Sequence, residues 1–381
     1  MLPLSIHFPG KLVFDRGCLQ RIPDEIISFG ATSILVVTID PLLNELKSLF
    51  NALESSGMTV EVNTSIVQEP SFAEFNELLE KYSGFNPDVV VGIGGGSVLD
   101  IAKLLAAQIG NPQTLRDIVG IGLLKSRGKK LICMPTTSGT GSEVSPNAIL
   151  VDETDNQKKG IISPFLVPDV VYVDPLLTLT VPPGITATTG LDALTHCLEA
   201  YTNNFAHPFI DLYAYEGMRL IGGNLVKAVK DGSDEEARTG VAMGSLLGGF
   251  CLGPVNTAGV HALSYPLGST FHLAHGLSNA LLLPYVMEFN LLASPKKYAE
   301  VAIALGCSPD ETPEKTARKG IEKIHDFIRE CGMPARLSEV GVPREAIQAM
   351  AVDALKIQRL LRNNPRVITE ADAIMIYESA F

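Results

Sequence analysis

The order of strand and helix patterns along the chain most constrains the fold. Apolar, β-branched runs alternate with helical spacing as far as Asp174, and after that residue only helical patterns follow. The strand patterns cover residues 33–38, 58–62, 88–93, 130–134 and 170–174, with helical patterns at 42–53, 72–82 and 97–108. Alternating strands and helices, with strands that are apolar throughout, predict a doubly wound, mostly parallel sheet covered by helices.

A proline and glycine cluster, Val181-Pro182-Pro183-Gly184, separates this pattern from the rest of the chain. The helical patterns beyond it cover residues 186–201, 210–230, 295–305, 313–330 and 344–361. A chain of 381 residues exceeds what one hydrophobic core usually serves. We therefore predict an α/β domain over residues 1–182 and an all-α domain over residues 183–381.

The charge and the cysteines limit the partners and the compartment. The formal net charge is -12 and no stripe of lysine and arginine occurs, which argues against nucleic acid and membrane surfaces as partners. The six cysteines are scattered without a CxxC pair, which is typical of reduced thiols, and the N-terminus does not resemble a signal peptide. We expect a cytoplasmic protein with a small-molecule substrate.

One stretch, residues 239–287, contains no Asp, Glu, Lys or Arg. Pro254, Pro266, several glycines and three histidines interrupt it, and lipid-exposed backbone tolerates such breaks poorly. We therefore predict buried helices around a polar site in place of a membrane span.

Two loops favour a bound dinucleotide. Gly92-Ile93-Gly94-Gly95-Gly96-Ser97 lies between an apolar strand and a helix, where backbone amides and the helix N-terminus can receive a pyrophosphate. By itself the cluster could be only a tight turn, since it does not match GxGxxG. Pro135-Thr136-Thr137-Ser138-Gly139-Thr140-Gly141-Ser142-Glu143 follows the next strand and adds hydroxyls and amides at the edge where such sheets bind ligands. Asp40 could accept a hydrogen bond from a ribose hydroxyl, or it could simply cap a helix.

Asp192 and His196 are four residues apart in a segment of good helix formers, so both side chains leave one helical face. Such a pair is usually a surface hydrogen bond or a satisfied core histidine. Here, however, His261, His272 and His275 lie in the uncharged stretch, and burying several imidazoles is costly unless they are paired or bind a metal. One carboxylate with imidazoles suits Fe²⁺, Zn²⁺ or a neighbouring divalent metal, which would act as a Lewis acid on an alcohol oxygen.

Taken together, these motifs resemble the iron-containing alcohol dehydrogenase family, which includes lactaldehyde reductase, 1,3-propanediol dehydrogenase and butanol dehydrogenases. The similarity runs through nearly the whole chain. It includes Gly94-Gly95-Gly96-Ser97-x-x-Asp100-x-x-Lys103, the loop from Pro135 to Glu143, Gly190-Leu191-Asp192-Ala193-Leu194-x-His196, and His261-x-x-x-x-Pro266-Leu267-Gly268 leading to His275-Gly276.

The resemblance implies a nicotinamide-binding first domain and a catalytic, metal-binding second domain that transfer hydride between NAD or NADP and a small alcohol or aldehyde. It implies Asp192, His196, His261 and His275 as metal ligands and catalytic residues, with His272 left out. It also implies a homodimer or larger assembly. The cofactor contacts that it implies, together with Asp40, are Gly94, Gly95, Gly96, Ser97, Thr136, Thr137, Thr140, Asn147 and Lys158, with Lys159 as the alternative lysine.

Two positions depart from the family pattern. Tyr265 stands where many members carry a histidine near the nicotinamide, which puts a proton relay at that position in doubt. Ile39 precedes Asp40 where members that prefer NAD place the aspartate directly after Val-Thr, so NAD is only modestly favoured over NADP. A rough alignment assigns the substrate pocket to Asn147, Leu252, Tyr265 and Leu360, which leaves the alcohol undetermined.

Two other functions compete with the dehydrogenase. A lyase resembling dehydroquinate synthase would share the architecture and use NAD with zinc, but it would need more basic residues near the metal motifs. A metal-binding protein without catalysis would not need the two glycine and hydroxyl loops.

Overall fold

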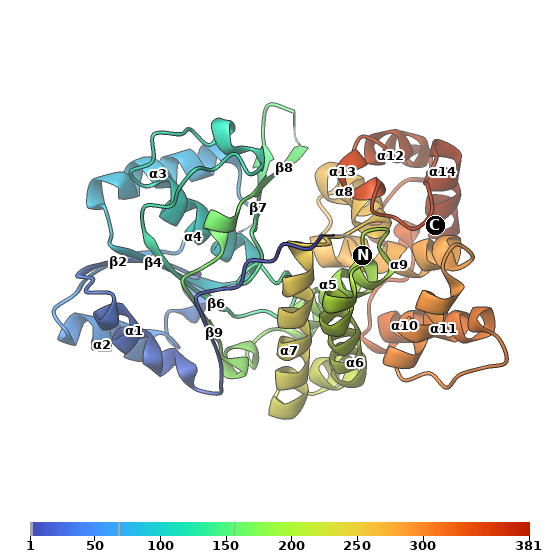
Figure 1. Cartoon of the computed structure of the whole chain (residues 1–381), viewed down its shortest axis with the longest axis horizontal. Coiled ribbons are helices and arrows are strands. Elements are labelled where there is room, and N and C mark those ends of the chain that lie inside the picture. The colour runs from blue at the N-terminus through green and yellow to red at the C-terminus, as the bar shows by residue number, and fades with distance from the viewer. Residues whose placement is uncertain (1–2, 68, 156) are drawn as a thin grey trace. The chain divides into compact units, whose positions relative to one another are not determined.

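The computed structural model describes residues 3–67, 69–155 and 157–381 (Figure 1). These residues form two compact units. The α/β unit consists of His7–Thr137 and Ser142–Thr178, and the helical unit consists of Leu179–Phe381, Ser138–Gly141 and the start of the chain up to Ile6. The predicted fold class, an α/β domain followed by an all-α domain, is confirmed, while the functional boundary between residues 182 and 183 stays a prediction.

The α/β unit contains a six-stranded sheet whose strand pairs are all parallel, as predicted. In spatial order its strands are β1 (Lys11–Phe14), β9 (Val170–Val173), β6 (Lys130–Pro135), β4 (Val89–Gly94), β2 (Ser33–Val37) and β3 (Thr59–Asn63). The edge strand β1 was not predicted, because it has only four residues, and all four are exposed or half-buried.

Alternate side chains of the central strands enter two separate cores, because successive side chains of a strand point to opposite faces. Leu35 and Val37 pack with α3 (Phe72–Phe85) and α4 (Gly96–Gln108), and Ile34 and Val36 pack with α1 (Ile22–Ser28) and α2 (Lys47–Ser55) (Figure 1). The sheet is therefore covered on both faces. The short 3-10 helices of this unit are η1 (Cys18–Arg21), η2 (Asp40–Leu42), η3 (Arg116–Ile118), η4 (Pro164–Leu166) and η5 (Pro175–Thr178).

The boundaries of α3 follow from its sequence. Ser71 and Glu74 form a capping box, in which each side chain accepts a hydrogen bond from the backbone of the other residue. Asn86 ends the helix in the left-handed conformation, with φ of 51°.

A second, three-stranded sheet was not anticipated. It has the order β5 (Gly120–Ile121), β8 (Gln157–Ile162) and β7 (Asn147–Asp152), and β7 and β8 pair antiparallel. The polar start of β8, Gln157-Lys158-Lys159, hides this hairpin from a search for apolar strands.

The helical unit contains the predicted helices, with one correction. The pattern at residues 344–361 was interpreted as one helix, but the chain forms η7 (Arg344–Ala346), α12 (Ile347–Ala354) and α13 (Gln358–Leu361) in its place. The helices end where Ala354, Leu360 and Leu361 enter the core, so packing overrides the helical spacing there. The other elements are α5 (Pro183–Thr202), α6 (Pro208–Lys230), α7 (Glu235–Leu252), α8 (Gly259–Phe271), α9 (His275–Leu291), α10 (Pro295–Ala304), α11 (Pro313–Glu330), η6 (Leu337–Val340) and α14 (Glu370–Ser379).

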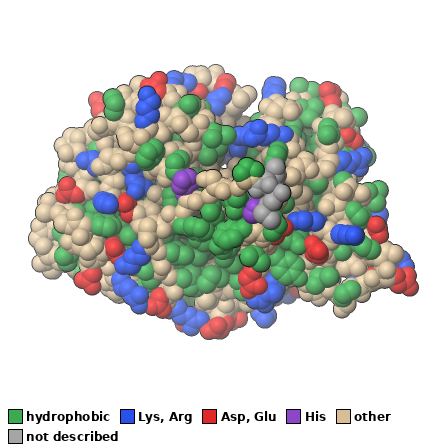
Figure 2. All heavy atoms as spheres, viewed as in Figure 1, with side chains coloured by type: hydrophobic (Ala, Val, Ile, Leu, Met, Phe, Trp, Pro, Cys, Tyr) green, Lys and Arg blue, Asp and Glu red, His purple; other side chains and the backbone are tan. Residues whose placement is uncertain are grey.

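The uncharged stretch forms most of α7, all of α8 and most of α9, which are largely buried. None of the described helices combines the length and the apolar character that crossing a membrane requires. On the face drawn in Figure 2, basic and acidic side chains are interspersed.

Candidate functional site

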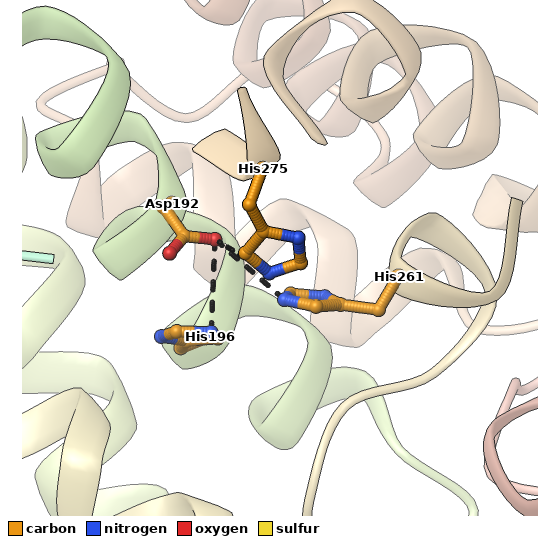
Figure 3. Close-up of side chains that lie close together, drawn as sticks. All are labelled: Asp192, His196, His261 and His275. Atoms are coloured by element: carbon orange, nitrogen blue, oxygen red, sulfur yellow. Dashed lines mark ion pairs between the residues drawn. The ribbon is translucent and has the colours of Figure 1, made fainter. Parts of the chain in front are cut away.

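Four side chains of the helical unit converge on one point (Figure 3). Asp192 and His196 come from α5, His261 from α8 and His275 from the first position of α9. The Oδ1 atom of Asp192 lies 3.7 Å from His196 Nε2, 3.6 Å from His261 Nε2 and 3.7 Å from His275 Nε2. All four potential ligand atoms lie within 4.8 Å of one another, and three of the four residues are buried.

A glycine brings α9 against α5. A Cβ atom at Gly276 would lie 2.2 Å from the carbonyl oxygen of Thr188 and 3.3 Å from the Cβ of Asp192. Real atoms do not approach so closely, so only glycine lets the first turn of α9 approach α5 at this point. The pair His275-Gly276 therefore supplies both a potential ligand and the space that brings it to Asp192.

The geometry and the chemistry of the four residues fit a divalent cation. Bonds of about 2.0–2.2 Å in a tetrahedral site place neighbouring ligand atoms about 3.3–3.6 Å apart, close to the distances from Asp192 Oδ1. The donor atoms are one carboxylate oxygen and three imidazole nitrogens, which suit iron, zinc and similar metals.

Glu199 supports the site from α5 and was not identified from the sequence. Its Oε2 lies 2.5 Å from His261 Nδ1, and its Oε1 accepts a hydrogen bond from the backbone amide of Val260 at 2.6 Å. A carboxylate on Nδ1 orients the imidazole and leaves Nε2 to face a metal. The spacing could have revealed it, because Glu199 follows Asp192 by two helical turns on the same face of α5.

Burial and the neighbouring charges shift the pKa values of the cluster. Burial favours the neutral form of Asp192, but His196, His275 and His261 outweigh it and hold the pKa of Asp192 well below its usual range. Burial also lowers the pKa of His196. Burial acts to lower the pKa of His261, but the Glu199 and Asp192 carboxylates outweigh it and raise this pKa to about 9. The cluster therefore has an ionised carboxylate at its centre, which is suited to a cation.

The other residues assigned to this region are more dispersed. The rings of Tyr265 and His275 have centroids 6.4 Å apart, so Tyr265 lies near the metal ligands. Leu252 and Leu360 are buried in the helical unit. His272 is exposed and ends α8 in the left-handed conformation, with φ of 54°, and it is not one of the four converging residues.

In the α/β unit, the glycine loop joins β4 to α4. A Cβ at Gly94 would lie 2.7 Å from the Cβ of Val98, so that glycine is required for packing of strand and helix. At Gly95 the nearest atom to an added Cβ is the Oγ1 of Thr137 at 3.5 Å, which is an ordinary contact. Gly95, Gly96 and Ser97 are partly exposed at the N-terminus of α4, where amides and the helix dipole favour an anion.

The order of strands places the glycine loop at a topological switch point. β4 lies between β2 and β6, and the chain leaves β2 toward β3 but leaves β4 toward β6. Open parallel sheets bind ligands in the crevice beyond the carboxyl ends of such neighbouring strands. Asp40 is exposed just after β2, beside this crevice, and it is the first residue of η2, whose N-cap is Ile39.

The loop after β6 lies next to the glycine loop. Thr136 donates its backbone N–H to the carbonyl oxygen of Gly94 at 3.0 Å, and Thr137 is the residue that a Cβ at Gly95 would meet first. Thr140, in contrast, belongs to the segment Ser138–Gly141 of the helical unit. The structure therefore brings Thr136 and Thr137 to the glycine loop and assigns Thr140 to the other compact unit.

A buried lysine fixes the segment that follows this loop. Lys103 of α4 is fully buried and donates to the backbone carbonyl of Ser142 at 2.8 Å, to the hydroxyl of Ser142 at 2.9 Å and to the carbonyl of Asn147. Asp100 accepts from the amide of Ile149 at 2.9 Å and lies 3.6 Å from Lys103 Nζ. The Asp-x-x-Lys part of the glycine motif thus connects α4 to the start of β7.

The two candidate lysines form ion pairs within the α/β unit. Lys158 Nζ lies 2.8 Å from Glu69 Oε1, and Lys159 pairs with Asp155. Asn147 begins β7 and belongs to this unit as well. Its backbone is held by Lys103, as described above.

A doubly wound parallel sheet, followed by a helical unit that carries a carboxylate and histidine cluster, is compatible with a metal-dependent oxidoreductase. Residues 9–175 match the family profile described as "Iron-containing alcohol dehydrogenase", and residues 186–381 match "Fe-containing alcohol dehydrogenase family, C-terminal". The chain belongs to the iron-containing alcohol dehydrogenase family.

Individual relatives match over almost their whole length. Long-chain-alcohol dehydrogenase 1 of Geobacillus thermodenitrificans (strain NG80-2) is 40% identical over 383 residues, which cover 99% of this chain and 96% of that protein. The structure of a 1,3-propanediol oxidoreductase is similar with a TM-score of 0.95 at 30% identity, covering 100% of both chains. A sulfoacetaldehyde reductase from Bifidobacterium kashiwanohense in complex with NAD⁺ has a TM-score of 0.89 at 28% identity, covering 100% of this chain and 99% of that one.

These findings identify the chain as an oxidoreductase that acts on alcohols and aldehydes, which are small molecules. The predicted class of enzyme is confirmed. The lyase alternative is not favoured.

Proposed function

We propose that this chain is an Fe²⁺-dependent enzyme that transfers hydride between NAD and a small alcohol or aldehyde. The observation that carries the proposal is the convergence of Asp192, His196, His261 and His275 within 4.8 Å, with Glu199 held against His261. These four side chains hold the metal, which acts when bound as a Lewis acid toward the substrate oxygen.

The ligand set admits iron as well as zinc, and the family supports the choice of iron. The four residues provide no thiolate, the donor that holds zinc most firmly, so metal availability and geometry decide which cation occupies the site. All three histidines are present, as in family members that depend on iron, and the family descriptions name iron.

The nicotinamide cofactor supplies or accepts the hydride, and the α/β unit binds it. Backbone amides of Gly94, Gly95, Gly96 and Ser97 receive the pyrophosphate at the N-terminus of α4. The Asp40 carboxylate accepts a hydrogen bond from a ribose hydroxyl, and its negative charge disfavours the additional phosphate of NADP. The remaining contacts that we assign to the cofactor are Thr136, Thr137, Thr140, Asn147 and Lys158.

The helices around the metal residues control charge and water. Asp192 is held ionised among the imidazoles, and Glu199 fixes the ring of His261 so that Nε2 faces the site. The uncharged segments of α7, α8 and α9 surround these groups with apolar side chains, which strengthens their electrostatic effect on a bound substrate.

The domain roles, the assembly and the location of the protein are also part of the proposal. We assign cofactor binding to residues 1–182 and metal binding with catalysis to residues 183–381. The family resemblance supports a homodimer or larger assembly, which light scattering can test. All six cysteines are free thiols, which supports a reducing compartment and hence a cytoplasmic location.

Metal reconstitution tests the iron assignment. Apoprotein is loaded anaerobically with Fe²⁺ or Zn²⁺, and turnover is measured before and after exposure to peroxide. We expect the highest rate with Fe²⁺ and loss of that rate on oxidation, since Zn²⁺ has no redox chemistry. Full activity with Zn²⁺ and indifference to peroxide would contradict iron and leave the dehydrogenase assignment intact.

A substrate panel tests the rest of the proposal. Lactaldehyde, butyraldehyde, acidic semialdehydes and longer aldehydes are reduced with NADH and with NADPH. We expect reduction of small neutral aldehydes with a higher kcat/KM for NADH. Exclusive use of NADPH would contradict the role given to Asp40.

A further inference from the structure

An asparagine points into the group of metal ligands. Asn279 lies on α9 one turn after His275 and is fully buried. Its Nδ2 donates to Asp192 Oδ1 at 2.7 Å and lies 3.1 Å from His261 Nε2 and 3.3 Å from His275 Nε2. The side-chain amide therefore contacts three of the four atoms that we assign to the metal.

The other end of this amide is unsatisfied. Asn279 Oδ1 is buried and accepts no hydrogen bond from any described residue. A buried polar atom without a partner destabilises the folded state, so its presence calls for a reason.

The properties of a carboxamide supply that reason. Without a cation, the amide donates to the Asp192 carboxylate and lies within 3.3 Å of the Nε2 atoms of His261 and His275. A cation among the same atoms would repel the partly positive NH2 group. A half-turn about the terminal torsion of the asparagine exchanges oxygen and nitrogen with almost no change in shape. After that rotation, a hard oxygen donor faces the cation.

We propose that Asn279 is a fifth residue of the metal centre, whose amide donates to Asp192 in the metal-free protein and whose Oδ1 faces the cation in the loaded protein. This inference rests on the proposed metal site. It adds an oxygen donor to the carboxylate and three imidazoles, and it explains why an unsatisfied amide oxygen is retained beside them.

The test measures cation binding directly. Co²⁺ is the probe, because its visible absorption reports the number of donors and its dissociation constant follows from competition with a chelator. Asn279→Leu keeps the approximate size and removes both polar atoms. Ser278→Ala is the matched control, since the Ser278 hydroxyl is also buried on α9 but bonds to the carbonyl of Ala274 at 3.1 Å.

We expect Asn279→Leu to weaken Co²⁺ binding about tenfold or more and to intensify the absorption of each bound ion, as fewer donors do. Ser278→Ala should match the wild-type protein in both respects. If Asn279→Leu also matches it, Asn279 is not part of the metal centre.

Asn279→Asp keeps the test decisive if the leucine variant does not fold. It retains an oxygen donor and adds a negative charge, so we expect Co²⁺ to bind at least as tightly as in the wild-type protein. Weaker binding by the aspartate variant would overturn the inference. Failure of the wild-type protein itself to bind Co²⁺ would instead refute the proposed metal site.

Discussion

In the α/β unit, the groups that we assign to ligand binding are mainly backbone amides at the ends of β4 and β6. In the helical unit they are side chains that arrive from α5, α8 and α9. The amide site depends on the absence of side chains at Gly95 and Gly96. The metal site depends on the identity of each side chain and on the contacts that orient it. The two sites should therefore fail in different ways when residues are replaced.

The largest effect is expected from removing a metal ligand. His261→Ala or His275→Ala should abolish turnover and weaken metal affinity by more than about 100-fold, since loss of an outer-shell partner alone costs about 10–100-fold. Metal analysis of the purified variants and NADH titration provide the measurements.

His272→Asn is the matched control, because His272 is exposed and asparagine tolerates its left-handed conformation. It should keep the wild-type metal content. Wild-type metal content and rate in either alanine variant would refute the ligand assignment.

A smaller effect is expected from the residue that orients His261. Glu199→Gln should weaken metal affinity about 10–100-fold while leaving cofactor affinity unchanged, because the amide no longer holds the imidazole as a carboxylate does. Chelator competition measures the change.

Glu300→Gln is the comparison for Glu199→Gln, since Glu300 is another carboxylate of the helical unit and accepts from the Tyr201 hydroxyl at 2.6 Å. It should leave metal affinity unchanged. Equal metal affinity in the Glu199→Gln and wild-type proteins would limit Glu199 to a packing role.

A substitution in the glycine loop should weaken cofactor binding and leave metal binding unchanged. Gly95→Val should weaken NADH binding about tenfold or more, a loss of about 1.4 kcal/mol, because the side chain fills the space next to the amides. Metal content should not change. NADH fluorescence gives the dissociation constant.

Gly94→Ala serves as a contrast, because the added Cβ would lie 2.7 Å from the Cβ of Val98. We expect this substitution to lower the thermal stability more than it lowers the affinity for NADH. An unchanged NADH affinity in Gly95→Val would move the cofactor away from this loop.

The last effect leaves both binding sites in place and concerns the stability of the α/β unit. Glu143 is buried, and burial raises its pKa to about 7 although Lys103 acts in the opposite direction. The folded state therefore binds this proton more tightly than the unfolded state, so stability falls as the pH rises from about 4.5 to 7 and then levels off. The loss should not exceed about 3.4 kcal/mol, which is the value for a pKa shift from 4.5 to about 7 at about 1.36 kcal/mol per unit.

Glu143→Gln should remove this dependence, and denaturant unfolding between pH 5 and pH 8 measures it. Parallel pH profiles for the variant and the wild-type protein would show that Glu143 does not titrate in this range.

The sequence by itself determined the features that depend on neighbouring residues. Strand and helix alternate with distinct periods, so the parallel sheet and most helices could be predicted. The glycine loop was recognisable because strand, loop and helix are consecutive. Asp192 and His196 were paired because four residues complete about one helical turn.

Tertiary structure decided what depends on distant contacts. His261 and His275 could be assigned to Asp192 only through the family resemblance, since no periodicity links three separate helices. Three features depend on the packing of α5, α8 and α9 against one another and have no signal in the local sequence. They are the close approach at Gly276, the contact of the Glu199 carboxylate with His261, and the position of the Asn279 amide among the ligands. The same reason explains the division of residues 344–361 into shorter helices, because core packing can override local helical preference.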